Sequence, residues 1–182
     1  MKRTQFLVMC ALFTALIIVG AFIKIPIPVV PFTLQVLFTT LAGALLGSKG
    51  GAISTACYAF LGLIGIPVFT QGGGFGYVLQ PSFGYILGFI AGAFVTGLIV
   101  ERAKNLTFAR SLIANFAGLI IVYAMGMVYY YLICKYALLA PIGLWNLFFY
   151  CFLMVVPGDI CLCVLAAVLT KKIRPIIKKY EA

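Results

Sequence analysis

The sequence places one carboxyl group inside an apolar stretch. Asp159 lies within residues 155–162, whose other members are apolar, glycine or proline. A charged side chain at the centre of a membrane helix costs about 2.5–3.5 kcal/mol on insertion scales, so Asp159 is a candidate functional group. It could accept hydrogen bonds from the N–H donors of a ligand, and the sequence leaves open whether it is ionised or protonated. The alternative is a structural role, in which it bonds backbone freed at Pro157. The other acidic residues, Glu101 and Glu181, are expected to be solvated surface groups.

Polar and aromatic side chains near one set of ends of the apolar stretches form a second group of candidates. The polar members can exchange hydrogen bonds with a ligand, and the aromatic members can form apolar walls. Three helices are expected to begin on that side, where their free N–H groups could hold an anion. Placement in a membrane interface explains some of these residues equally well. The polar candidates are Thr33, Gln35, Gln71, Gln80, Ser82, Tyr85 and Asn146, and the aromatic ones are Phe75, Tyr77, Tyr85 and Trp145.

The sequence lacks the residues that most enzymes and metal sites need. It has no histidine, and its six cysteines show no CxxC spacing, so we expect neither a metal site nor a cofactor. No second intramembrane acid is available to pair with Asp159, and no nucleophile motif is present, so we expect no enzyme. Residues 43–50 read GALLGSKG, which has the wrong glycine spacing for a P-loop.

The composition is typical of an integral membrane protein. Hydrophobic residues make up 65% of the 182 residues and charged residues 9%, against about 45–50% and about 25% in ordinary soluble domains. We therefore expect an all-α protein that forms a single transmembrane domain over residues 1–182. The apolar stretches predict six transmembrane helices, three of them shorter than a full bilayer crossing. These helices are expected at 4–24, 34–48, 51–66, 83–101, 110–134 and 144–170.

The basic residues predict the orientation of the chain. With six alternating spans and the N-terminus inside, all 13 basic residues except Lys24 and Lys135 fall on one side. Lysine and arginine are enriched in cytoplasmic segments, so both termini are expected to be cytoplasmic. The net charge of +10 is then a consequence of topology, and we expect no nucleic-acid binding.

The two expected outer loops, 24–35 and 65–85, are apolar, aromatic and rich in proline and glycine. Non-helical backbone at membrane depth persists only where it is buried in protein or lines a cavity. These loops are therefore expected to cover a pocket that opens to the outside, with rigid connectors as the alternative.

Small residues recur at four-residue spacing, which lets a neighbouring helix approach closely. Ala11 and Ala15 form AxxxA in the first expected helix, and GxxxG pairs occur at Gly43/Gly47, Gly47/Gly51 and Gly88/Gly92. Packing within the chain is the simplest interpretation of the glycine pairs.

The order of several motifs resembles the BioY family, the biotin-binding S components of energy-coupling factor (ECF) vitamin transporters. The resemblance rests on residues 30–35 (VPFTLQ), on Tyr58, and on residues 61–62 and 65–69. It continues through the glycine loop 72–74, residues 81–85 (PSFGY) and residues 157–159 (PGD). One departure is Leu162, where members of the family often carry a lysine.

This resemblance implies a compact six-helix bundle that captures biotin from outside in the cytoplasmic membrane of a prokaryote. It implies a transmembrane coupling protein and two ATPase subunits as partners, with Ala11 and Ala15 docking on the coupling protein. The substrate-binding residues it suggests are Asp159, Tyr85, Gln35, Thr33, Gly73, Gly74, Gln80, Ser82 and Asn146. Lys24 and Lys135 could each bind the carboxylate of biotin, but either lysine could instead extend to the membrane interface.

Two other functions fit the same sequence features. An S component for another small vitamin would have the same fold. A stand-alone secondary transporter would have to use Asp159 as its coupling site, because no other intramembrane residue is ionisable.

Overall fold

The computed structural model describes residues 3–26, 30–103, 105–140 and 142–181, with side chains described as far as residue 177. The chain is mostly helical. Its long helices are α1 (Arg3–Phe22), α2 (Gln35–Leu63), α3 (Phe83–Arg102), α4 (Phe108–Leu132) and α6 (Val156–Glu181). Its short elements are β1 (Lys24–Ile25), β2 (Phe32–Thr33), η1 (Phe75–Leu79), η2 (Ile133–Ala137), α5 (Leu144–Phe148) and η3 (Phe149–Leu153).

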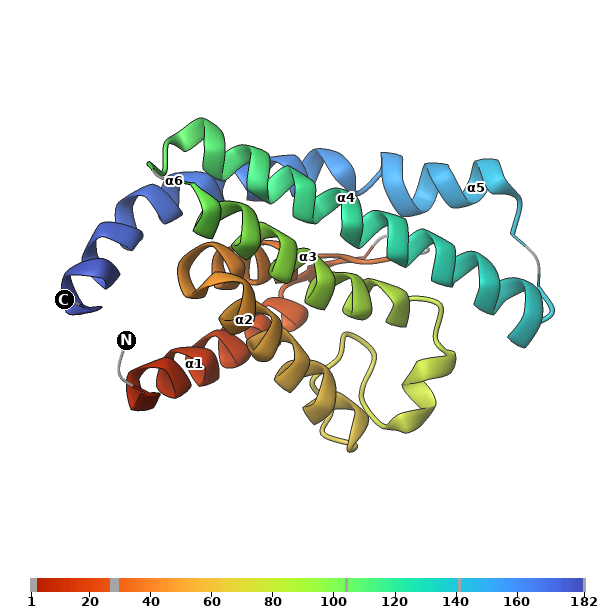
Figure 1. Ribbon diagram of the computed structural model, residues 1–182. Helices are drawn as coiled ribbons and strands as arrows, with labels where there is room; N and C mark the ends of the chain where they lie inside the picture. The colour runs from red at the N-terminus through yellow and green to blue at the C-terminus, as the bar shows by residue number, and fades with distance from the viewer. Residues whose placement is uncertain (1–2, 27–29, 104, 141, 182) are drawn as a thin grey trace.

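The helices pack in one bundle with two distinct ends. Figure 1 shows α4 and α6 along one edge, α3 beside α4, and α1 and α2 along the opposite edge. Both termini, the bend of α2 and the α3–α4 connection lie at one end, at the left of the view. The long segment between α2 and α3 and the connection between α4 and α5 lie at the other end. The first end carries the segments predicted to be cytoplasmic and the second carries two of the segments predicted to be outside, and the orientation itself stays a prediction.

Helix α2 is sharply bent at Gly47, whose φ of 80° is non-helical. The bend brings Gly51 against Gly43, so that a Cβ atom on Gly51 would lie 2.6 Å from the Cα atom of Gly43. The two arms of α2 correspond to the spans predicted at 34–48 and 51–66. Five helices of the described chain are long and apolar enough to cross a membrane when α2 is counted once, and the six-span count stays a prediction.

Glu101 holds the bend of α2 in place. Its carboxylate accepts hydrogen bonds from the backbone N–H of Ser48 at 2.9 Å and from Ser48 Oγ at 2.8 Å. Both donors are at the start of the second arm, where a helix N-terminus favours negative charge. The side chain is exposed, as predicted, but it also caps a helix of the bundle.

The glycine pairs pack inside the chain, in agreement with the simplest interpretation. A Cβ atom on Gly43 would lie 2.3 Å from the carbonyl oxygen of Ala93, and one on Gly92 would lie 2.8 Å from that of Gly118. Helix α3 therefore packs closely against α2 on one side and α4 on the other. Ala11 and Ala15, in contrast, are exposed on the outer face of α1.

The predicted helix 144–170 is divided in two, which corrects the sequence-based boundary. Helix α5 passes into the π-helical turn η3, and α6 begins afresh at Val156. Pro157 explains the division, because proline has no backbone N–H and is tolerated in the first turn of a helix. Asp159 consequently lies in the first turn of α6 and not in the middle of a helix.

Candidate functional site

The bundle encloses a cavity. It is lined by residues of the two outer loops, of α2, α3 and α4, and of the segment at the start of α6. The space between its lining residues, including the part open to solvent at the mouth, is about 570 Å³. The residues that line it are Val30, Pro31, Thr33, Gln35, Val36, Tyr58, Thr70, Tyr77, Ser82, Tyr85, Ile86, Phe89, Val122, Tyr123, Val155 and Asp159. Most of this surface is apolar or aromatic, so a few polar atoms decide what the cavity can recognise.

Asp159 supplies an unpartnered acceptor in this cavity. The residue is only 3% exposed, and its Oδ2 accepts a hydrogen bond of 2.5 Å from the hydroxyl of Tyr123 on α4. Its Oδ1 is buried and has no hydrogen-bond partner among the described residues. A buried polar atom without a partner costs about 1–3 kcal/mol, so the site favours a ligand that donates an N–H or O–H group to Oδ1.

Gln35 supplies an unpartnered donor. Its Oε1 accepts a hydrogen bond of 3.2 Å from the hydroxyl of Thr33, which turns the amide nitrogen the other way. Nε2 is buried and lacks a hydrogen-bond partner within the described part of the chain. Gln35 is the first residue of α2, directly after the short β1–β2 ladder. The fold thus presents one acceptor and one donor to the same apolar space.

Tyrosine rings form much of the wall, and their hydroxyl groups are tied to the protein. Tyr85 Oη donates to the carbonyl oxygen of Cys151 at 3.1 Å, and the Tyr85 ring meets the Tyr123 ring edge to face, with centroids 6.2 Å apart. On the other side, Tyr77 Oη lies 3.1 Å from Thr70 Oγ1. Fixed aromatic rings of this kind offer rigid apolar surfaces to a ligand.

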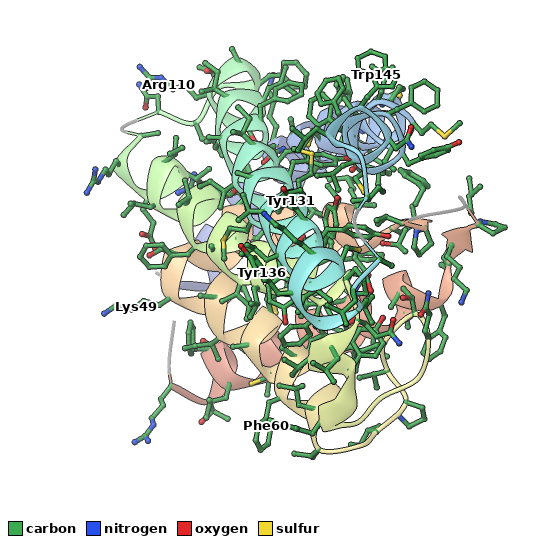
Figure 2. All side chains as sticks on the ribbon, turned by 90° about the vertical axis from the view of Figure 1, so that its right-hand side faces the viewer. Lys49, Phe60, Arg110, Tyr131, Tyr136 and Trp145 are labelled. Carbon is green, nitrogen blue, oxygen red and sulfur yellow. The ribbon has the colours of Figure 1, made fainter. Side chains whose placement is uncertain are left out.

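The two outer basic residues differ in their surroundings. Lys24 is exposed, and its Nζ donates to the carbonyl oxygen of Thr70 at 2.6 Å. Because Thr70 lines the cavity, this contact places a positive charge beside the lining. Lys135 instead lies over the rings of Tyr131 and Tyr136, 5.6 Å and 5.3 Å from their centroids; Figure 2 shows both rings near the end of α4.

The structure brings five of the nine predicted site residues to the cavity, namely Asp159, Tyr85, Gln35, Thr33 and Ser82. Gln80 and Asn146 are exposed and do not line it. Phe75 and Trp145, predicted as walls, are 80% and 72% exposed, and Figure 2 shows Trp145 at the edge of the molecule.

Gly73 and Gly74 also lie outside the cavity lining, and the structure gives them a role in the loop. The backbone N–H of Gly74 donates to the carbonyl oxygen of Gly62 at 2.7 Å. A Cβ atom on Gly73 would lie 2.3 Å from the carbonyl oxygen of Ile66. These glycines therefore let the outer loop pack against the end of α2.

Sequence reasoning missed Tyr123, the partner of Asp159, together with Phe89, Val122 and Thr70. One signal was available for Tyr123: it lies eight residues after Asn115, on the same face of α4. Asn115 is fully buried and donates from Nδ2 to the carbonyl oxygen of Cys163 at 2.9 Å. Polar residues at this helical spacing indicate a face turned toward the inside of the bundle.

Comparisons with known proteins relate the chain to one family. The model of the BioY family matches residues 1–179. A protein of Lysinibacillus sphaericus named probable biotin transporter BioY is 44% identical over 181 residues, covering 100% of this chain and 92% of its own. A biotin transporter BioY of Thermotoga maritima is 48% identical over 122 residues, covering 66% of this chain and 71% of its own.

A solved structure has the same fold. It is the crystal structure of the S component for biotin from an ECF-type ABC transporter, with a TM-score of 0.82 and 31% identity. The match covers 96% of this chain and 95% of that one.

Proposed function

We infer that this chain, which belongs to the BioY family, binds biotin and takes part in its uptake across a membrane. The family consists of transporters, so the chain is not an enzyme. The observation that carries the proposed mode of binding is the pair of unpartnered buried atoms in one apolar cavity, Asp159 Oδ1 and Gln35 Nε2.

The ureido ring of biotin carries the N–H donors and the carbonyl acceptor that these two atoms require. Its N–H groups would donate to Asp159 Oδ1, and its carbonyl oxygen would accept from Gln35 Nε2. Both atoms would then gain the partner they lack, and a site built around such buried polar groups rejects analogues that leave them unpaired. The fused rings and the aliphatic chain of biotin would lie against Tyr85, Phe89 and Val122, which favours burial of apolar surface.

Lys24 is the residue we assign to the carboxylate of biotin. Its ammonium group already contacts Thr70, a lining residue, and it has further N–H donors to offer. Lys135 is held over two tyrosine rings instead. The same lysine joins the first outer loop to the second, so binding of the carboxylate would strengthen the contact between the two loops.

We further propose six membrane crossings, with the two arms of α2 as separate spans and both termini in the cytoplasm. The bend at Gly47 and the distribution of basic residues support this topology. The S-component fold supports partnership with an ECF coupling protein and its two ATPases in the cytoplasmic membrane. The exposed Ala11 and Ala15 offer a flat strip on α1 for that coupling protein.

The choice of vitamin can be tested by competition. Purified protein in detergent is equilibrated with labelled biotin and an excess of unlabelled biotin, desthiobiotin, riboflavin or thiamine. We expect biotin and desthiobiotin to compete, because both carry the ureido group, and the other two vitamins to have no effect. Equal competition by riboflavin or thiamine, or no binding of biotin by folded protein, would contradict the proposal.

A further inference from the structure

A second hollow lies at the end of the molecule that carries both termini. It is a cleft between the end of α3 and the start of α4, lined by Ile99, Arg102, Ala103, Arg110 and Ile113, with about 810 Å³ of empty space that includes its open side. It shares no lining residue with the cavity that contains Asp159. Figure 2 shows Arg110 projecting from the start of α4 at the edge of the molecule.

The cleft is positively charged. Arg102 and Arg110 are both exposed, and none of the described residues that line the cleft is acidic. Glu101, the nearest acid in sequence to Arg102, directs both carboxylate oxygens to Ser48. Arg110 is held in position by the hydrogen bond of 2.9 Å from Nη1 to the carbonyl oxygen of Asn105. A guanidinium group has five N–H donors, so most of those of Arg110 remain for another partner.

Each helix contributes an isoleucine and an arginine three residues apart, in opposite sequence order on the two helices. On α3, Ile99 precedes Arg102 by three residues, and on α4, Ile113 follows Arg110 by three residues. The two arginines therefore lie nearer the helix ends, and the two isoleucines lie one turn further into the bundle. Ile99 is partly buried against Val100 and Ala114, whereas Ile113 is 62% exposed, so the protein leaves the apolar surface of Ile113 uncovered.

We propose that this cleft binds one anionic phospholipid of the cytoplasmic leaflet. Arg102 and Arg110 hold its phosphate, and Ile99 and Ile113 contact the first part of an acyl chain. In the topology proposed above, the arginines lie nearer the cytoplasmic surface than the isoleucines do, which is the order of the headgroup and the acyl chain in such a lipid. Basic pockets between helices on the cytoplasmic side are suited to anionic headgroups, and arginine binds phosphate through paired N–H donors. The proposal is independent of the ligand in the outer cavity.

Native mass spectrometry of the purified protein with added lipid tests this site. Phosphatidylglycerol and phosphatidylcholine with identical acyl chains are compared, and inorganic phosphate is added in a separate arm. The double variant Arg102→Gln/Arg110→Gln is compared with Lys171→Gln/Lys172→Gln, which removes the same charge from exposed positions outside the cleft. Gel filtration and biotin binding show that each variant is folded.

We expect the parent protein to retain one phosphatidylglycerol in preference to phosphatidylcholine. The arginine variant should bind phosphatidylglycerol about tenfold more weakly or worse, because each basic residue near the surface contributes to attraction of anionic lipid. The lysine variant should bind as the parent does. Equal loss in both double variants would show diffuse attraction and overturn the site. Displacement of the lipid by inorganic phosphate would also overturn it, because the site would then be one for a small anion.

Discussion

Tyr123 and Asp159 form a hydrogen-bonded pair among the residues that line the cavity. The hydroxyl of Tyr123 donates to Asp159 Oδ2, and Oδ1, which has no partner among the described residues, is the proposed acceptor for biotin. Hydrogen bonds contribute about 0.5–1.5 kcal/mol, and more when one partner is charged. We therefore expect Tyr123→Phe to bind biotin about three- to tenfold more weakly in equilibrium dialysis. Tyr131→Phe, on the same helix and outside the cavity lining, is the matched control, and equal affinities of the two variants would contradict this role of Tyr123.

The proposed contact between Lys24 and the carboxylate of biotin can be tested by changing the ligand and the residue together. Exposed ion pairs contribute about 0.2–1 kcal/mol, so the parent protein should prefer biotin to its neutral carboxamide by up to about fivefold. Lys24→Gln should bind the two ligands equally, and Lys135→Gln should keep the preference. Isothermal titration calorimetry measures all six affinities. A preference that survives Lys24→Gln would assign the carboxylate to another group.

Residue types in the sequence indicated part of the site. Asp159 could be recognised because an acid in an apolar stretch is costly, and the loop motifs indicated Thr33, Gln35, Ser82 and Tyr85. The spacing of Tyr123 from Asn115 could have indicated an inward-facing position, but its contact with Asp159 depends on the distance between α4 and α6, which no local pattern encodes. Gln80 and Asn146 lie in the expected segments, but their side chains are exposed.

At the scale of helices, close packing of α2 against α3 depends on Gly43. A Cβ atom there would meet the backbone carbonyl of Ala93, and backbone cannot move aside as a flexible side chain can. Overpacking of this kind costs about 1–3 kcal/mol, so Gly43→Ala should lower the midpoint of thermal unfolding in detergent by several degrees. Gly76→Ala is the control, since no atom of the described residues lies within 4 Å of its Cβ position. Equal midpoints would show that α3 can shift to accept the methyl group.

Hydropathy predicted the position of most of the long helices well. The observed bounds of α1, α3 and the start of α4 fall within two residues of the predicted ones. The division between α5 and α6 was missed, although Pro157 was a local signal for it. The shape of the bend at Gly47 could not be predicted from local sequence. It depends on the hydrogen bond from Ser48 to Glu101, which lies 53 residues further along the chain.

For the whole molecule, the central prediction of topology is that residues 49 and 145 lie on opposite sides of the membrane. Both Lys49 and Trp145 are exposed. In a background without the native cysteines, Trp145→Cys should react with a membrane-impermeant maleimide added to intact cells. Lys49→Cys should react only after the cells are opened. Labelling of both positions in intact cells would contradict the six-span arrangement with cytoplasmic termini.

The affinity of Asp159→Ala for biotin tests the proposed mode of binding most directly. Equilibrium binding to the purified protein would be compared with that of the parent and of Asn146→Ala, which alters an exposed residue outside the cavity. Loss of a buried acceptor should weaken binding about a hundredfold, because the ureido N–H groups would be desolvated without a partner. Asn146→Ala should bind as the parent does. If folded Asp159→Ala bound biotin as tightly as the parent, the carboxyl group would not be the acceptor, and the proposed mode of binding would be wrong.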